Sequence, residues 1–143
     1  DYMLKYFLRN KKINYLTNNN FGVSRKIAAG LDICIFTLKD LKKINKLVNN
    51  KIYKEYPTTY FYTKGKNKFT TKDILLPKKL IIDNKYRLTL DNETDLKFFR
   101  KLFSLFKNKI NPYTKLSYIK KILTTNPSLR KINFDVKQFS PKL

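Results

Sequence analysis

The chain has 143 residues, and its 32 Lys and Arg against 10 Asp and Glu give a formal net charge of +22. With 42% hydrophobic and 15% aromatic residues, three Gly and five Pro, the composition excludes a disordered basic tail and predicts a single folded domain over residues 1–143. The sequence has no His and a single Cys, which excludes Ser-His-Asp triads, Cys-His nucleophiles and zinc sites built from Cys and His.

The start of the chain predicts a short helix followed by two strands. Apolar and aromatic residues over 2–8 indicate the helix, and residues 13–16 indicate the first strand. The polar stretch over 17–20 predicts a loop. Residues 31–36 form an apolar run of strand length, in which Cys34 is expected to be a buried side chain.

The middle of the chain predicts a second helix, an aromatic strand and a turn. Residues 38–48 carry apolar side chains at helical intervals, and Thr37 with Asp40 has the spacing of a capping box at the start. Residues 58–62 are aromatic and β-prone, which predicts a strand. Residues 64–68 predict a turn.

The last third predicts two helices flanked by two strands. The strands are expected over residues 86–90 and 132–136, and the second helix over residues 115–123. The first helix, over residues 94–107, has Asn92 as its predicted cap. One apolar stripe on this helix is expected to be buried, and it consists of Leu96, Phe99, Phe103, Phe106 and Ile110.

Strands and helices alternate with short connections, so the predicted fold class is α/β. Without His, carboxylates are the main candidates for chemistry. Asp32 lies inside a hydrophobic predicted strand, where a buried charge is costly unless it is paired or binds a cation. Asp91 lies where a predicted strand turns into a helix, the sheet edge at which ligands bind and at which a carboxylate suits Mg2+. A turn or capping role for Asp91 is the alternative, and Glu93 and Asp95 need only complement the helix dipole.

The charge predicts attraction to polyanions, of which nucleic acid and an anionic membrane surface are the first candidates. However, 27 of the 32 basic residues are Lys, and together with 15 Asn this is also what AT-rich codons produce without selection for binding. Evolved readers of bases and phosphates usually use more Arg. The charge alone therefore leaves both explanations open.

No apolar stretch reaches the length of a membrane span, and the start of the chain lacks the pattern of a signal peptide. A soluble intracellular protein with no membrane partner is expected. Because the sequence opens with Asp1 rather than Met, it is expected to be a processed product, a cloned segment or a piece of something longer.

Three segments of the chain carry a family resemblance when they are read together and in order. Residues 30–36, Gly-Leu-Asp-Ile-Cys-Ile-Phe, are similar to a Gly-Leu-Asp-Val-Glu-Val-Phe strand. Residues 87–91, Arg-Leu-Thr-Leu-Asp, with Asp95 and Leu96 after them, are similar to Arg-Leu-Thr-Val-Asp-Thr-Pro-Glu-Asp-Leu. Asn126-Pro127, followed by Ile132-Asn133 and Val136-Lys137-Gln138, resembles the closing segment of the same family pattern. The pattern, which covers essentially the whole chain, resembles the C-terminal half of cytidylyltransferases of the spore-coat polysaccharide and acylneuraminate type, which make CMP-activated sugars from CTP.

The resemblance implies the C-terminal part of a three-layer α/β/α nucleotidyltransferase-like sandwich with a mixed sheet. By this resemblance Asp91 would be a Mg2+ ligand, Asp32 would line the sugar site, and Arg87 would be a further substrate-binding residue close by. CTP and a sugar would be the partners, and no residue of this chain is assigned a catalytic role. In the family, the glycine- and arginine-bearing loop that grips CTP belongs to the N-terminal half, and residues 1–143 contain no counterpart to it.

Several polar residues of the family pattern are replaced in this chain. Cys34 stands where the family has Glu, and residues 55–60 resemble Glu-His-Val-Thr-Pro-Tyr without the His. Two hypotheses follow. The chain is the C-terminal portion of a cytidylyltransferase-like protein, inactive on its own, or it is a non-catalytic basic relict of that fold. A relict would serve as a structural or RNA-associated subunit, with a homo-oligomer or a larger assembly as its setting.

Overall fold

The computed structural model describes residues 1–19, 26–106 and 114–137. These residues form two compact units. The first consists of residues 1–19 and 32–75, and the second of residues 26–31, 76–106 and 114–137. Each unit has a hydrophobic core of its own.

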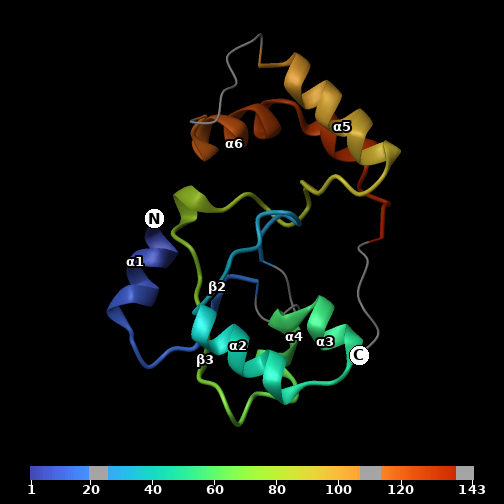
Figure 1. Cartoon of the computed structure of the whole chain (residues 1–143). Coiled ribbons are helices and arrows are strands. Elements are labelled where there is room, and N and C mark those ends of the chain that lie inside the picture. The colour runs from blue at the N-terminus through green and yellow to red at the C-terminus, as the bar shows by residue number, and fades with distance from the viewer. Residues whose placement is uncertain (20–25, 107–113, 138–143) are drawn as a thin grey trace. The chain divides into compact units, whose positions relative to one another are not determined.

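The first unit combines helices with a small mixed sheet (Figure 1). Its helices are α1 (Tyr2–Arg9), α2 (Leu38–Leu47), α3 (Lys51–Glu55) and α4 (Pro57–Tyr62). Its strands are β1 (Tyr15–Thr17), β2 (Cys34–Phe36) and β3 (Thr71–Asp73), in the order β2-β1-β3. The central strand β1 pairs antiparallel with β2 and parallel with β3, so that Leu16 lies opposite Ile35 and Lys72. The two predicted N-terminal strands exist, but each is shorter than expected.

The helix α2 was predicted over residues 38–48 and ends one residue earlier, at Leu47. Its start is set by a local capping signal. Thr37 has an extended backbone, and its Oγ1 accepts a hydrogen bond from the Asp40 amide at 3.0 Å. The same hydroxyl donates to Asp40 Oδ2 at 2.7 Å. Ile44 and Val48 then face the core, which confirms the cap and the C-terminal part of the predicted apolar side, whereas Leu38 is 65% exposed.

Residues 58–62, predicted as a strand, form the helix α4. Pro57 occupies the first turn, where its missing N–H group costs no hydrogen bond. Tyr60 and Phe61 are 5% and 0% exposed, and the Phe61 ring stacks on Tyr15 at 4.8 Å between centroids. Burying these adjacent aromatic rings from a helix outweighs their intrinsic β propensity, which depends strongly on context.

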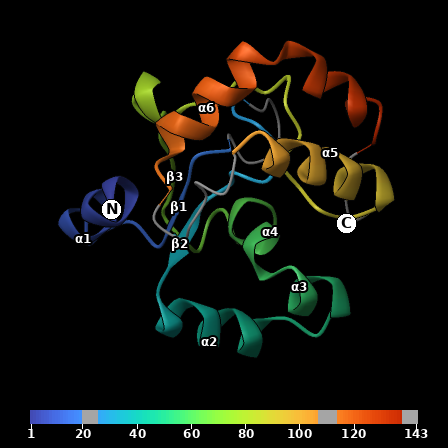
Figure 2. The same cartoon turned by 90° about the horizontal axis from the view of Figure 1, so that it is seen from above.

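The second unit is built from helices and irregular segments. It contains the 3-10 helices η2 (Lys78–Leu80) and η3 (Pro127–Ile132) and the α-helices α5 (Glu93–Ser104) and α6 (Leu116–Thr125). Figure 2 shows α5, α6 and the segment that follows α6 from above. Its core includes Ala28, Ile82, Tyr86, Phe98, Leu102, Phe106, Ile122, Leu123 and Leu129. The two predicted C-terminal helices are confirmed.

The strands predicted over residues 86–90 and 132–136 are wrong. In the first segment the described residues form one isolated parallel bridge, between Ala29 and Arg87. Gly30 follows with φ of +94°, and a Cβ atom there would overlap the Leu88 carbonyl, so glycine permits this close approach. The second segment continues η3 to Ile132 and then turns. In the described structure neither segment lies beside a strand with which it could form a row of backbone hydrogen bonds, so neither segment becomes a strand.

The buried face of α5 also differs from the prediction. Phe98 and Leu102 are 0% and 3% exposed, whereas Phe103 is 48% exposed and Leu96 is 36% exposed. Of the predicted stripe, Phe106 is buried and Phe99 is partly buried against the core. Ile110 lies outside the described residues. The helix therefore buries Phe98 and Leu102, which lie beside the predicted stripe, and exposes Leu96 and Phe103 of that stripe.

The fold is therefore mixed α/β, as predicted at that level. Among the described residues, none of the helices is long and apolar enough to cross a membrane.

Candidate functional site

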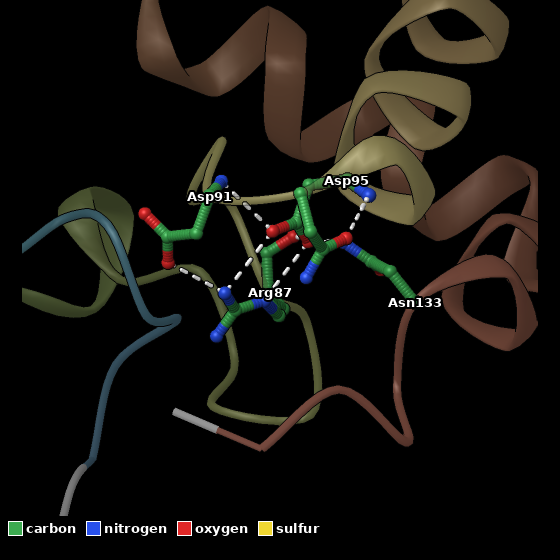
Figure 3. Close-up of polar contacts among 5 residues, drawn as sticks. Arg87, Asp91, Asp95 and Asn133 are labelled. Atoms are coloured by element: carbon green, nitrogen blue, oxygen red, sulfur yellow. Dashed lines mark hydrogen bonds and ion pairs between the residues drawn. The ribbon is translucent and has the colours of Figure 1, made fainter. Parts of the chain in front are cut away.

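The second unit contains a buried ion-pair network centred on Arg87 (Figure 3). Arg87 lies in the segment before α5, and its side chain is 8% exposed. Its Nε donates to Asp95 Oδ1 at 2.9 Å and its Nη2 donates to Asp95 Oδ2 at 3.0 Å. These two parallel bonds form the bidentate arrangement that guanidinium and carboxylate groups favour.

Asp95 is the fully buried partner in this network. Its carboxylate also accepts hydrogen bonds from the Asp91 amide at 3.0 Å and from Asn133 Nδ2 at 2.8 Å. Burial raises the pKa of Asp95, but the hydrogen bonds from Arg87, Asp91 and Asn133 outweigh burial and lower it to about 2. The hydrogen bond to Asp95 likewise raises the pKa of Arg87, against the opposing effect of burial. Both groups are therefore charged at neutral pH.

Asn133 links the end of η3 to this network. Besides its bond to Asp95, its Nδ2 donates to the Arg87 carbonyl at 3.2 Å. Within the described residues, Asn133 Oδ1 and Thr89 Oγ1 are buried and have no hydrogen-bond partner. Each of these oxygens can still form a hydrogen bond with a small polar group.

Asp91 is the exposed carboxylate of the site. Its side chain is 53% exposed, and its Oδ2 accepts a hydrogen bond from Arg87 Nη2 at 2.6 Å. Figure 3 shows the other carboxylate oxygen directed away from the network. Because the Asp91 amide is bound to Asp95, the backbone that carries this carboxylate is held at the start of α5. Asp91 therefore exposes one carboxylate oxygen, while its other oxygen and its backbone amide are held by hydrogen bonds to Arg87 and Asp95.

Two residues singled out from the sequence lie elsewhere. Asp32 belongs to the first unit and is exposed, and it precedes β2 instead of lying within it, so the expected buried charge is wrong. Cys34, the first residue of β2, is exposed instead of buried, so the predicted burial is wrong. Its Sγ lies 3.0 Å from Tyr15 Oη. Burial, followed by this hydrogen bond, raises the pKa of Tyr15.

The site includes two residues for which the sequence had suggested no such role. The sequence places Asp95 in the first turn of a helix and Asn133 in the closing segment of the family resemblance. Neither residue has a local signal for burial, because their partner Arg87 is 8 and 46 positions away in the chain. Among the described residues, no group of three or more His, Cys, Asp or Glu side chains is arranged to hold a metal ion.

Comparisons with known proteins found no matching family model, no matching curated protein and no matching solved structure.

Proposed function

We propose that this chain is the C-terminal portion of a cytidylyltransferase-type protein that transfers CMP from CTP to a sugar, with the three-layer nucleotidyltransferase sandwich as the complete fold. In this proposal Asp91 supplies one carboxylate ligand to Mg2+. The observation that carries the proposal is the way in which separate segments of the sequence resemblance meet in the second unit.

Parts of all three resembling segments are in contact there. Ala29, just before the first segment, accepts a hydrogen bond from the Leu88 amide at 2.7 Å. Gly30, which opens that segment, packs closely against the Leu88 carbonyl. Asn133 of the closing segment binds both Arg87 and Asp95 of the middle one. Three segments that resembled the family only by chance would not need to contact one another. These contacts therefore support the proposal that the three segments belong to one family fold.

The donor chemistry of Asp91 fits Mg2+. Mg2+ takes oxygen ligands and is usually bound through one or two carboxylates together with substrate phosphates. Asp91 offers an exposed oxygen while its Oδ2 remains on Arg87. When bound, the ion would neutralise charge that develops on the transferred phosphate. The further ligands would come from the phosphates of CTP or from groups beyond the described residues.

Arg87 has a positioning role in this proposal. Its guanidinium is nearly buried and directed at Asp91 and Asp95, so in this proposal it orients the Asp91 carboxylate. Asp95 and Asn133 in turn hold Arg87. This arrangement is a preorganised support for a metal ligand.

The proposal is tested on the natural gene product. We expect the upstream reading frame to encode a glycine- and arginine-bearing phosphate loop, and the intact protein to release pyrophosphate from CTP in the presence of an acidic sugar and Mg2+. Asp91→Asn should abolish this release. Asp83→Asn, which removes another exposed carboxylate of the second unit, should retain it. An upstream frame without such a loop, or full activity in Asp91→Asn, would overturn the proposal.

A further inference from the structure

A basic pocket of about 850 Å³ opens on the first unit around the start of α2. Its lining includes five lysines, Lys11, Lys39, Lys42, Lys43 and Lys46, together with Asn14, Thr37 and Asp40. All five lysines are exposed. Lys11 comes from the segment after α1, and the other four come from α2. We call this feature the lysine pocket.

The positive charge of the lysine pocket is largely uncompensated. Asp40 is the one acid in the lining, and it is 8% exposed. Its two oxygens accept hydrogen bonds from neutral groups, Asn14 Nδ2 at 3.1 Å and Thr37 Oγ1 at 2.7 Å. Within the described part of the chain, no ion pair involves any of the five lysines. A concentration of positive charge in a hollow attracts anions more strongly than the same charge on a flat surface.

The spacing of the lysines indicates an extended anion. Lys39, Lys42 and Lys46 follow one another at intervals of three and four residues, so they share one face of α2. At about 1.5 Å of rise per residue, this row is about 10 Å long, which exceeds the size of one phosphate group. Lysine presents a point charge without fixed geometry, which suits successive phosphates irrespective of base sequence.

We propose that the lysine pocket binds the phosphate backbone of single-stranded nucleic acid without sequence preference. This function is separate from the proposed transfer chemistry, which is assigned to the second unit. A strand of nucleic acid can enter a hollow and follow a row of charges. A lipid surface is broad and instead matches a flat or protruding basic face.

The test measures binding of the chain to a fluorescein-labelled 20-nucleotide oligouridylate by fluorescence anisotropy over a range of salt concentrations. We expect the triple variant Lys39→Gln/Lys42→Gln/Lys46→Gln to weaken binding at least about tenfold at ~50 mM salt. Because single strands contribute about 0.7 to the salt slope for each phosphate neutralised, the slope should fall by about 2. Lys43 is left unchanged because its ammonium group lies 5.0 Å from the Phe69 ring centroid.

The matched control is Lys97→Gln/Lys101→Gln/Lys121→Gln, which removes three exposed lysines from α5 and α6. It changes net charge equally, and we expect it to retain most of the affinity and slope. Acetylation footprinting of the unmodified protein gives a second measurement that requires no variant. The oligonucleotide should protect Lys39, Lys42 and Lys46 more than the three control lysines. Equal losses in both variants, uniform protection, absence of binding, or binding only to phosphatidylserine vesicles would each overturn the proposal.

Discussion

Arg87 and Asp95 form a bidentate ion pair in which neither side chain is more than 8% exposed, and this pair joins the segment before α5 to the helix itself. Asp95 shares one face of α5 with Phe98 and Leu102, three and seven residues later. Drawing Asp95 inward therefore turns those two apolar residues into the core. The ion pair thus explains why α5 exposes Phe103.

Removing the buried acid should destabilise the protein strongly. Asp95→Asn leaves the guanidinium of Arg87 without its main counter-charge, and breaking a buried pair in this way costs about 3–5 kcal/mol. Urea unfolding followed by circular dichroism measures the effect. Glu93→Gln, an exposed change in the same helical turn, should cost less than about 1 kcal/mol. Equal effects of the two substitutions would show that the pair does not stabilise the fold.

The same pair predicts how stability depends on pH. Folding lowers the pKa of Asp95 from 3.8 to about 2, so its contribution is fully present above pH 3.8 and is lost as the pH falls from 3.8 to about 2. Unfolding free energies measured across this window should decline. In Asp95→Asn this component of the decline should be missing, and parallel pH profiles for the two proteins would contradict the assignment.

The two apolar faces of α5 should respond differently to truncation. Phe98 is fully buried, so Phe98→Ala should lower the free energy of unfolding by about 3–5 kcal/mol. Phe103 is 48% exposed, so Phe103→Ala should cost less than about 2 kcal/mol. Denaturant unfolding of the two variants provides the comparison. A larger loss of stability in Phe103→Ala than in Phe98→Ala would indicate that Phe103 is the buried residue, as predicted from the sequence.

Transfer chemistry should be absent when the 143-residue chain is assayed by itself. The sequence has no glycine-rich phosphate loop of the Walker or Rossmann type, so CTP would lack the orientation that can be worth about 7–11 kcal/mol. Pyrophosphate release from CTP, measured with Mg2+ over a panel of acidic sugars, should stay at background. A turnover that disappears in Asp91→Asn would show instead that this chain builds a complete site.

Elements with local signals could be predicted from the sequence. Thr37 and Asn92 cap α2 and α5 as expected, because a capping side chain binds a backbone amide only three positions away. The helix α4 and the irregular segment 86–90 depend on partners distant in sequence, and propensity alone misassigned both. The sheet and its mixed pairing likewise depend on contacts between β1 and β3, which are more than 50 positions apart.

The candidate site could be predicted in part. The sequence places Asp91 at the end of a predicted strand that turns into a helix. The structure confirms the helix and shows Asp91 exposed beside Arg87, but residues 86–90 form no strand, so the sheet edge in that argument is wrong. The burial of Asp95 and the contribution of Asn133 could not be found, since both depend on the packing of η3 against α5. The predicted burial of Asp32 within a strand is wrong because β2 begins two residues after it, at Cys34.

Asp91 is the proposed metal ligand, and Mn2+ is a probe of that role because it binds the same oxygen ligands as Mg2+ and broadens nearby nuclear magnetic resonance signals. In a ¹⁵N-labelled sample of the natural gene product with CTP present, added Mn2+ should broaden the amide signals of Asp91 and its neighbours first. That selective broadening should vanish in Asp91→Asn and persist in Asp83→Asn. Broadening centred on other carboxylates, or unchanged by Asp91→Asn, would contradict the assignment of Asp91 as the metal ligand.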